Sequence, residues 1–203
     1  MAARRSFKCR NAHDNVMDDA DFHEETLNSE LVFDGRLLKV HRDAVRLPGG
    51  VESVREWIAH PGAVAVIAAL DNGKLLFERQ YRYPLRRIFL ELPAGKIDAG
   101  EHPLDTARRE LREETGYKAK SWRHLGTLHT CIGYSDEHIE IFLAHGLSFV
   151  GHAPDHGEIL EVTELTLNDA LLAVRDGEIT DGKTVACLLW ADKIFSGAWP
   201  IPT

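Results

Sequence analysis

The sequence predicts an α/β protein in which a mixed β-sheet lies between helices, an α+β arrangement, preceded by a small antiparallel β-sheet. Three observations support this prediction. Segments with strand-like and helix-like patterns interleave without the regular βαβ alternation that a doubly wound parallel sheet requires. Closely spaced Gly, Pro and Asp turn signals divide residues 30–58 into short strands. Three segments with helix signals fall among the strands of residues 59–203.

The first part of the chain divides into an extension and an arm. Residues 1–29 begin basic and turn acidic, and we expect them to form a poorly ordered N-terminal extension. Residues 30–58 are expected to form an N-terminal β-sheet arm, which is too short to bury a core of its own. The turn signals are Asp34-Gly35 and Pro48-Gly49-Gly50. The expected strands are Glu30–Phe33, Leu37–Leu47 and Val51–Ile58.

Residues 59–203 are expected to form one larger domain. It opens with a nearly continuous apolar run, Ala63–Leu70, which ends in Asp71-Asn72-Gly73, one of the strongest short signals for a β-hairpin. The chain then returns in a second strand, Lys74–Gln80. Further strands are expected at Ile88–Leu92, His124–Thr130, Glu137–Ala144 and Leu160–Leu165.

Three helices are expected within this domain. The first, Pro103–Thr115, has proline in its first turn and is followed by Gly116, where a left-handed cap is favoured. The second spans residues 166–175 and begins with a threonine that can cap it together with Asp169. The third, Lys183–Phe195, carries an apolar face that can pack on the sheet.

Composition and charge restrict the function. A chain of 203 residues suffices for one buried core with an appendage, and no apolar run approaches the roughly 20 residues that cross a bilayer. The formal net charge of -8 argues against nucleic acid or an anionic membrane as a partner, because such binding needs a positive surface. The cysteines are odd in number and far apart, which suits neither disulfides nor a zinc site. A cytoplasmic location is therefore expected.

An unusual density of carboxylates lies in residues 95–117. On the first expected helix, Glu113 and Glu114 follow Glu110 by three and four positions, so the three side chains project from one side. Like charges this close repel one another, and Mg²⁺, which prefers carboxylate oxygens and shares its shell with substrate phosphates, would reverse that repulsion. Arg109 can pair with Glu113, four positions on. A neighbouring apolar stripe can anchor the helix to the sheet: Leu104, Ala107 and Leu111.

The spacing of the fixed residues in this segment is specific. Gly95 is followed after five residues by Glu101, and after seven more by Arg109-Glu110-Leu111-Arg112-Glu113-Glu114-Thr115-Gly116-Tyr117. This pattern resembles the Nudix box of the Nudix hydrolase family. The resemblance implies a Nudix α/β/α sandwich that hydrolyses nucleoside diphosphates linked to another group, with Mg²⁺ as cofactor and Mn²⁺ as a substitute. Glu113 is implied in catalysis. The implied metal ligands are the Ala94 main-chain carbonyl and the side chains of Glu110, Glu113 and Glu114.

Segments outside the box are similar to one branch of that family. They begin at Phe33-Asp34-Gly35, Arg55-Glu56-Trp57, Arg79-Gln80-Tyr81 and Glu91-Leu92-Pro93, and they resemble the ADP-ribose pyrophosphatase branch. The resemblance implies hydrolysis of ADP-ribose to AMP and ribose 5-phosphate by a homodimer that exchanges its N-terminal sheets. The implied substrate contacts are Arg82 to phosphate, Arg55 and Glu56 at the adenosine end, and the loop that holds Gly133 and Glu137.

The resemblance leaves three points open: the preferred substrate, the functional class and the identity of the catalytic base. Ile132 stands where the ADP-ribose pattern has proline, so GDP-mannose or another sugar nucleotide is the alternative substrate. The alternative of another class is a sensor that binds ADP-ribose without cleaving it, which the complete set of acids disfavours. The catalytic base is expected to be Glu158, in the loop of residues 150–158, where it would accept the proton of the attacking water. The other candidates for this role are Asp155, His156 and Glu161.

Overall fold

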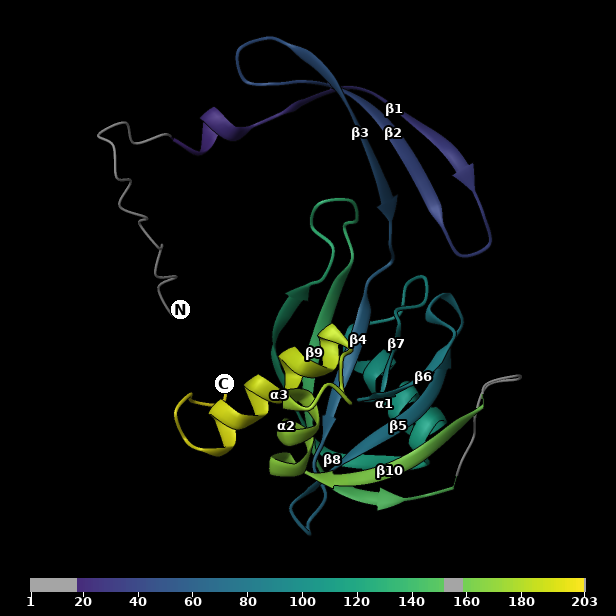
Figure 1. Cartoon of the computed structure of the whole chain (residues 1–203), viewed down its shortest axis with the longest axis vertical. Coiled ribbons are helices and arrows are strands. Elements are labelled where there is room, and N and C mark those ends of the chain that lie inside the picture. The colour runs from purple at the N-terminus through teal and green to yellow at the C-terminus, as the bar shows by residue number, and fades with distance from the viewer. Residues whose placement is uncertain (1–17, 152–158, 203) are drawn as a thin grey trace. The chain divides into compact units, whose positions relative to one another are not determined.

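The structure is a computed structural model, and it describes residues 18–151 and 159–202. The chain divides into two compact units, Met1–Trp57 and Ile58–Thr203. In Figure 1 the elements of the first unit are coloured purple to blue, and those of the second run from blue through green to yellow. Each unit is described by itself below.

The N-terminal unit is built on a three-stranded sheet in the order β1-β2-β3. Its elements are η1 (Asp19–Phe22), a 3-10 helix, and the strands β1 (Glu25–Asp34), β2 (Lys39–Arg46) and β3 (Glu52–Ala59). Strand β1 begins at Glu25, whereas the sequence placed the start of the sheet at Glu30. The reason is that Glu25 pairs in register with Arg46 and forms a 2.7 Å ion pair with it.

This N-terminal sheet buries little of its apolar surface. Among its described residues, Val45 is the one buried hydrophobic side chain. The ring of Trp57 stacks on His41 with centroids 4.8 Å apart and donates a 2.8 Å hydrogen bond to Asp43. The large hydrophobic side chains that stay exposed include Leu27, Leu31, Val32, Phe33, Leu37, Leu38, Val51 and Val54.

The second unit contains a four-stranded and a three-stranded sheet. The strand orders are β7-β4-β9-β8 and β10-β5-β6. The strands are β4 (Ala63–Ala68), β5 (Lys74–Arg82), β6 (Arg87–Glu91), β7 (Ala94–Lys96), β8 (Tyr117–His129), β9 (His138–Phe149) and β10 (Leu160–Thr166). Because β4 runs parallel to β9 and antiparallel to β7, the predicted mixed sheet is confirmed.

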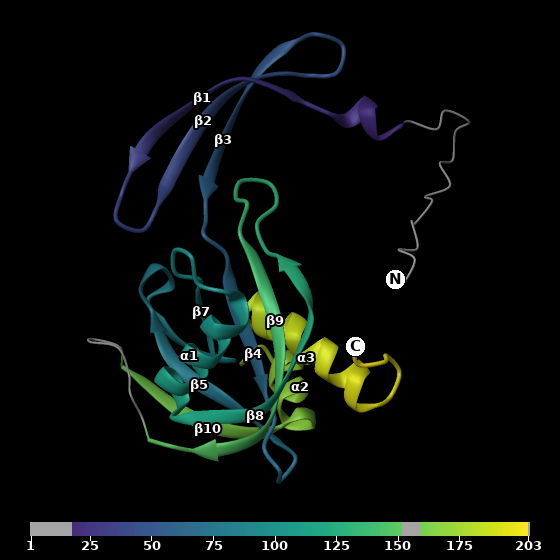
Figure 2. The ribbon, with the colours of Figure 1, turned by 180° about the vertical axis from the view of Figure 1, so that it is seen from behind.

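Helices cover both faces of the four-stranded sheet. They are α1 (Pro103–Thr115), α2 (Leu167–Arg175) and α3 (Gly182–Phe195), and a short 3-10 helix, η2 (Tyr83–Leu85), follows β5. Alternate residues of β4 point to opposite faces: Ala65 and Ile67 pack with α2 and α3, whereas Val64 and Val66 pack with α1. Figures 1 and 2, seen from opposite sides, show the resulting three layers. The predicted α/β/α sandwich is confirmed.

The three predicted helices agree with the structure to within one residue at each end. Three strands of the second unit differ more from the prediction, and one of them is β9, which was expected to end at Ala144 and continues to Phe149. The three-residue strand β7 was not expected, because Ala94-Gly95-Lys96 lacks the β-branched and aromatic residues that mark a strand. Strand β8 begins at Tyr117 rather than near His124, since its first half alternates polar side chains with few apolar ones. Within the described residues, every helix is too short or too polar to cross a membrane.

Candidate active site

Helix α1 presents its acids along one edge. It begins at Pro103, where His102 caps it by accepting a hydrogen bond from the Leu104 amide, and it ends at Gly116 with a φ of 77°. The side chains of Ala107 and Leu111 are fully buried against the sheet, as the apolar stripe predicted. That orientation leaves Glu110 and Glu114 on the flank that faces β7, and Glu113 contacts Arg109.

Arg109 links the helix to the loop before it. Its guanidinium donates to Glu101 at 2.9 and 3.1 Å, to Glu110 at 2.7 Å and to the Lys96 carbonyl at 3.2 Å. The predicted pairing with Glu113 is confirmed at 3.1 Å. The guanidinium lowers the pKa of Glu101 to about 2, and the hydrogen bond to Glu101 in turn raises the pKa of Arg109. These bonds hold the loop and two of the box glutamates in one geometry.

Strand β7 passes directly over Glu110. A side chain at Gly95 would overlap the Glu110 carboxylate, which explains why glycine stands at this position. The neighbouring amide of Ala94 donates a 3.0 Å hydrogen bond to Glu114. The three predicted ligand positions Ala94, Glu110 and Glu114 therefore lie together where β7 meets α1.

Glu114 is buried beside a second carboxylate that was not predicted. Glu114 is 4% exposed, and Glu78 on β5 is 0% exposed. Burial, and after it the charges of Glu78 and Glu110, raises the pKa of Glu114, and burial is also the main cause that raises the pKa of Glu78. Because two like charges this close disfavour each other's ionisation, a cation bound between them would relieve the repulsion.

The acids fit a hard divalent cation. Both oxygens of Glu78 are buried without a hydrogen-bond partner of normal geometry in the described part of the chain. Carboxylate oxygens of this kind are the donors that Mg²⁺ and Mn²⁺ prefer. Within residues 18–151 and 159–202, no three His, Cys, Asp or Glu side chains are arranged to hold a metal ion. In this structure Glu110 and Glu113 each accept a hydrogen bond from Arg109.

A second buried network lies next to this pair and includes Arg82. Arg82 was expected to face a substrate phosphate, and the structure pairs it with Glu91 through two 2.7 Å hydrogen bonds. Glu91 is 2% exposed and also accepts from Lys183, which donates at 2.9 Å to Asp181 at the start of α3. The sequence analysis missed Glu78, Glu91 and Lys183. A glutamate inside an otherwise apolar strand is rare, and that signal could have found the first two.

The remaining predicted residues lie elsewhere. Arg55 and Glu56 belong to the N-terminal unit, where they pair with Glu24 and Arg42 respectively. Gly133 lies in the turn between β8 and β9, and Glu137 accepts from Thr130 and lies 3.7 Å from His60. Glu161 on β10 pairs with Arg79 at 2.5 Å. Glu158, with the alternative bases Asp155 and His156, lies outside the described residues.

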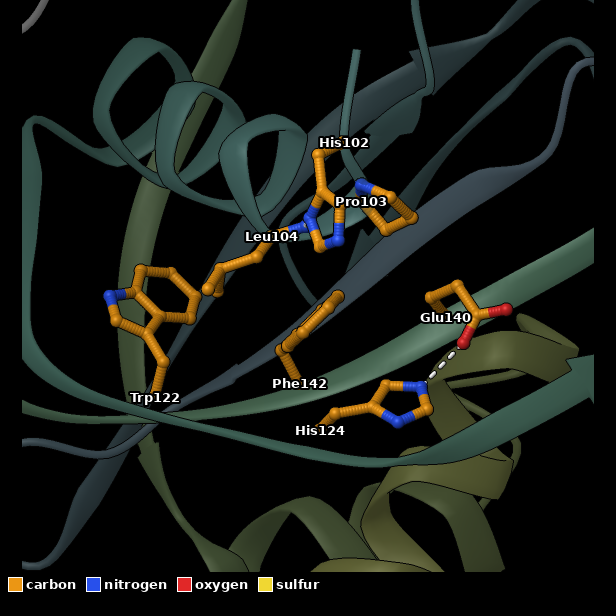
Figure 3. A pocket seen from close by; sticks show the side chains of 7 residues that line it. All are labelled: His102, Pro103, Leu104, Trp122, His124, Glu140 and Phe142. Carbon is orange, nitrogen blue, oxygen red and sulfur yellow. Dashed lines mark hydrogen bonds and ion pairs between the residues drawn. The ribbon is translucent and has the colours of Figure 1, made fainter. Parts of the chain in front are cut away.

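A cavity of about 390 Å³ opens on the other flank of α1. Figure 3 shows Phe142 at its centre, with Trp122 on one side and the hydrogen-bonded His124 and Glu140 on the other. The start of α1 closes it. The lining residues are His102, Pro103, Leu104, Trp122, His124, Glu140 and Phe142. No predicted site residue is among them, so this cavity is separate from the acids.

Comparison with known proteins places these features in a family. Residues 59–186 match the family described as "NUDIX domain", and residues 24–58 match one described as "Nucleoside diphosphate sugar hydrolase N-terminal domain". An ADP-ribose pyrophosphatase from Bacillus subtilis (strain 168) is 44% identical over 79% of this chain and 88% of its own length. A methanol dehydrogenase activator from Bacillus methanolicus is also 44% identical, over 81% and 90%.

A third relative and a solved structure agree with these matches. An ADP-ribose pyrophosphatase from Mycobacterium tuberculosis (strain ATCC 25618 / H37Rv) is 41% identical over 90% of both chains. The crystal structure of an ADP compounds hydrolase superposes with a TM-score of 0.77, covering 88% of this chain and 97% of the other. Its sequence identity is 24%, so this last match speaks for the fold alone.

Proposed function

The chain belongs to the Nudix hydrolase family, and from this membership we propose that it hydrolyses the pyrophosphate bond of ADP-ribose to give AMP and ribose 5-phosphate. The observation that carries the proposal is the edge of α1, where Glu110 and Glu114 meet β7 beside the buried carboxylate of Glu78, which no cation pairs with in the described part of the chain. The relatives named ADP-ribose pyrophosphatase, which match along most of the chain, support the substrate.

The cofactor in this proposal is Mg²⁺, for which Mn²⁺ can substitute. Glu110, Glu114 and the Ala94 carbonyl would hold it, with Glu113 contributing. When bound, the cation neutralises charge on the pyrophosphate and lowers the pKa of the attacking water. Arg109 keeps Glu110 and Glu113 aligned in this scheme, because it donates a hydrogen bond to each and its guanidinium stays charged whether or not the cation is bound.

The reaction adds water across one bond between phosphorus and the bridging oxygen. The water oxygen bonds to phosphorus, that phosphorus separates from the bridging oxygen, and the water proton passes to a base. We propose Glu158 for this role. Glu158→Gln should lower turnover by about 10²-fold or more while Mn²⁺ affinity stays near the wild-type value. Wild-type turnover in that variant would shift the assignment to Asp155, His156 or Glu161.

The proposed protein is a homodimer in which the N-terminal sheet serves as the exchanged arm. The exposed apolar residues of that sheet, such as Leu31 and Phe33, support a covering partner. In this arrangement Arg55 and Glu56 contact the adenosine end of the substrate, Arg82 a phosphate, and the loop with Gly133 and Glu137 completes the pocket. Light scattering at working concentration tests the assembly, and a monomer would contradict it.

A reducing cytoplasm is the setting that we propose. Cys131 and Cys187 are both free thiols. Burial raises the pKa of Cys187 to about 12, which makes this thiol unreactive in the folded protein. Two cysteines that remain free thiols are consistent with the reducing compartment that we propose.

A substrate panel tests the activity. Purified protein with Mg²⁺ is incubated in ¹⁸O-water with ADP-ribose, GDP-mannose, NADH, diadenosine polyphosphates and 8-oxo-dGTP, and mass spectrometry locates the label. We expect ADP-ribose to turn over fastest, with Glu114→Gln as the inactive control. Faster cleavage of GDP-mannose would favour the alternative suggested by Ile132. Tight binding of ADP-ribose without cleavage of any compound would identify a sensor instead.

A further inference from the structure

Glu78 is a fully buried carboxylate whose hydrogen-bonding neighbour in the described part of the chain is another carboxyl group, that of Glu114. Its exposure is 0%, and neither of its oxygens has a hydrogen-bond partner of normal geometry there. An ionised carboxylate in such a place is costly unless it is paired or coordinates a metal. A buried position of this kind in a native fold therefore asks for an explanation.

The residue opposite Glu78 is a buried carboxylate that is paired with cations. Glu91 on β6 pairs in register with Glu78 on β5 and is buried to a similar degree. It accepts two 2.7 Å hydrogen bonds from Arg82 and a further bond from Lys183. The two cations of this region thus donate hydrogen bonds to Glu91, and neither of them donates one to Glu78.

The direction of Glu78 follows from the strand. Alternate residues of β5 share a face, so Glu78 points the same way as Leu76, which packs in the cluster that contains Leu111 of α1. Glu114 lies one turn after Leu111 on the same helix. The apolar contact between β5 and α1 therefore continues directly into a contact between two carboxyl groups.

We propose that Glu78 is a further ligand of the divalent cation and binds it together with Glu114. The inference rests on the proposed function, because it takes the cation of that reaction as given. Mg²⁺ is usually bound by one or two carboxylates, with water and substrate phosphate completing its shell. Two buried carboxylates are therefore enough to anchor the cation, and Glu110 with the Ala94 carbonyl completes the protein ligands of the proposed site.

Mn²⁺ binding to the full chain without nucleotide tests this assignment, because it needs no turnover. Free Mn²⁺ is measured by electron paramagnetic resonance during titration of the wild type, Glu78→Gln and Glu114→Gln. Glutamine keeps the size of the side chain and one hydrogen-bonding oxygen but removes the charge. Glu164→Gln on β10 is the matched control, since Glu164 is partly exposed and pairs with Lys74 at 3.5 Å.

We expect Glu78→Gln to weaken Mn²⁺ binding by about tenfold or more, because loss of even an outer-shell partner of a metal ligand typically costs that much. Glu164→Gln should bind as the wild type does. Affinity within twofold of the wild type in a folded Glu78→Gln protein would overturn the proposal. It would mean that Glu78 and Glu114 merely share a proton, which glutamine can replace by a hydrogen bond. Circular dichroism confirms folding of each variant.

A second variant decides the matter if Glu78→Gln does not fold. Glu78→Asp keeps the charge and withdraws the carboxylate by one methylene, so it should bind Mn²⁺ measurably more weakly; wild-type affinity there would overturn the proposal as well.

Failure of this inference is distinct from failure of the proposed function. If the wild type cleaves ADP-ribose and Glu78→Gln binds Mn²⁺ normally, only the assignment of Glu78 as a ligand is refuted. If Glu78→Gln loses Mn²⁺ binding but the wild type cleaves no nucleotide, only the proposed activity is refuted.

Discussion

In the N-terminal unit Val45 is the one hydrophobic side chain buried among the described residues, whereas on β4 alone Val64, Ala65, Val66, Ile67 and Ala68 are all buried. The N-terminal sheet is held by ion pairs whose side chains stay exposed, such as Arg46 with Glu25. Exposed pairs contribute little, about 0–1 kcal/mol each. The second unit therefore has a buried apolar core, whereas the first buries little apolar surface of its own.

The largest effect is expected on turnover, from a substitution in the second unit that leaves the N-terminal sheet unchanged. Glu114→Gln removes a carboxylate at the junction of β7 and α1 and should lower turnover of ADP-ribose by about 10³-fold, equivalent to several kcal/mol of transition-state stabilisation. Steady-state kinetics measures the loss. Light scattering should give the wild-type mass, because the arm is untouched, and a change of mass would show that the two regions are not independent.

Paired truncations of leucine test the difference in burial. Leu111→Ala removes a fully buried side chain of α1 and should lower the free energy of unfolding by about 3 kcal/mol. Leu31→Ala on β1, where the leucine is 45% exposed, should change it by about 0.5 kcal/mol or less and weaken self-association instead. Urea denaturation measures the first quantity and concentration-dependent light scattering the second. Equal destabilisation by both variants would mean that the arm has a core of its own.

The pH dependence of the Glu101–Arg109 contact offers a smaller effect in the second unit. Hydrogen bonding to Arg109 lowers the pKa of Glu101 to about 2 in the folded protein, from an ordinary value of about 4.5. A lowered pKa means that the contact contributes fully above pH 4.5 and is lost as the pH falls toward 2. The melting temperature of Glu101→Gln should therefore lie below that of the wild type at pH 6, and the gap should close on acidification. A gap independent of pH would exclude the ion pair as its cause.

The smallest effect is expected from an ion pair of the arm. Arg46→Ala removes contacts to Glu25 at 2.7 Å and to Glu52 at 3.5 Å, all of them between half-exposed side chains. The free energy of unfolding should change by about 0.5 kcal/mol or less. Thermal denaturation at low and high salt measures it. A loss of several kcal/mol would show that surface charges hold the arm together after all.

Local signals made helix α1 predictable from the sequence, and long-range pairing made its surroundings unpredictable. Pro103, Gly116 and the spacing of the box glutamates lie within one segment, so the helix and the edge that carries its acids could be inferred. Glu78 could not be placed beside Glu114, because that contact depends on how β5 packs under α1. Arg82 was expected to be available to a phosphate, and only the register of β5 with β6 shows that Glu91 lies within its reach.

The parallel pairing of β4 with β9 has a consequence for the way the chain reaches its native state. Ala63 is aligned with Ile139 and Ala68 with Ala144, so the central strand finds this neighbour far along the chain. During synthesis, which delivers the N-terminal end first, the apolar β4 emerges long before β9 exists. Non-local pairing of this kind slows folding and prolongs the exposure of apolar, aggregation-prone segments. The nascent chain should therefore have its greatest need of a chaperone while residues 63–138 are being made.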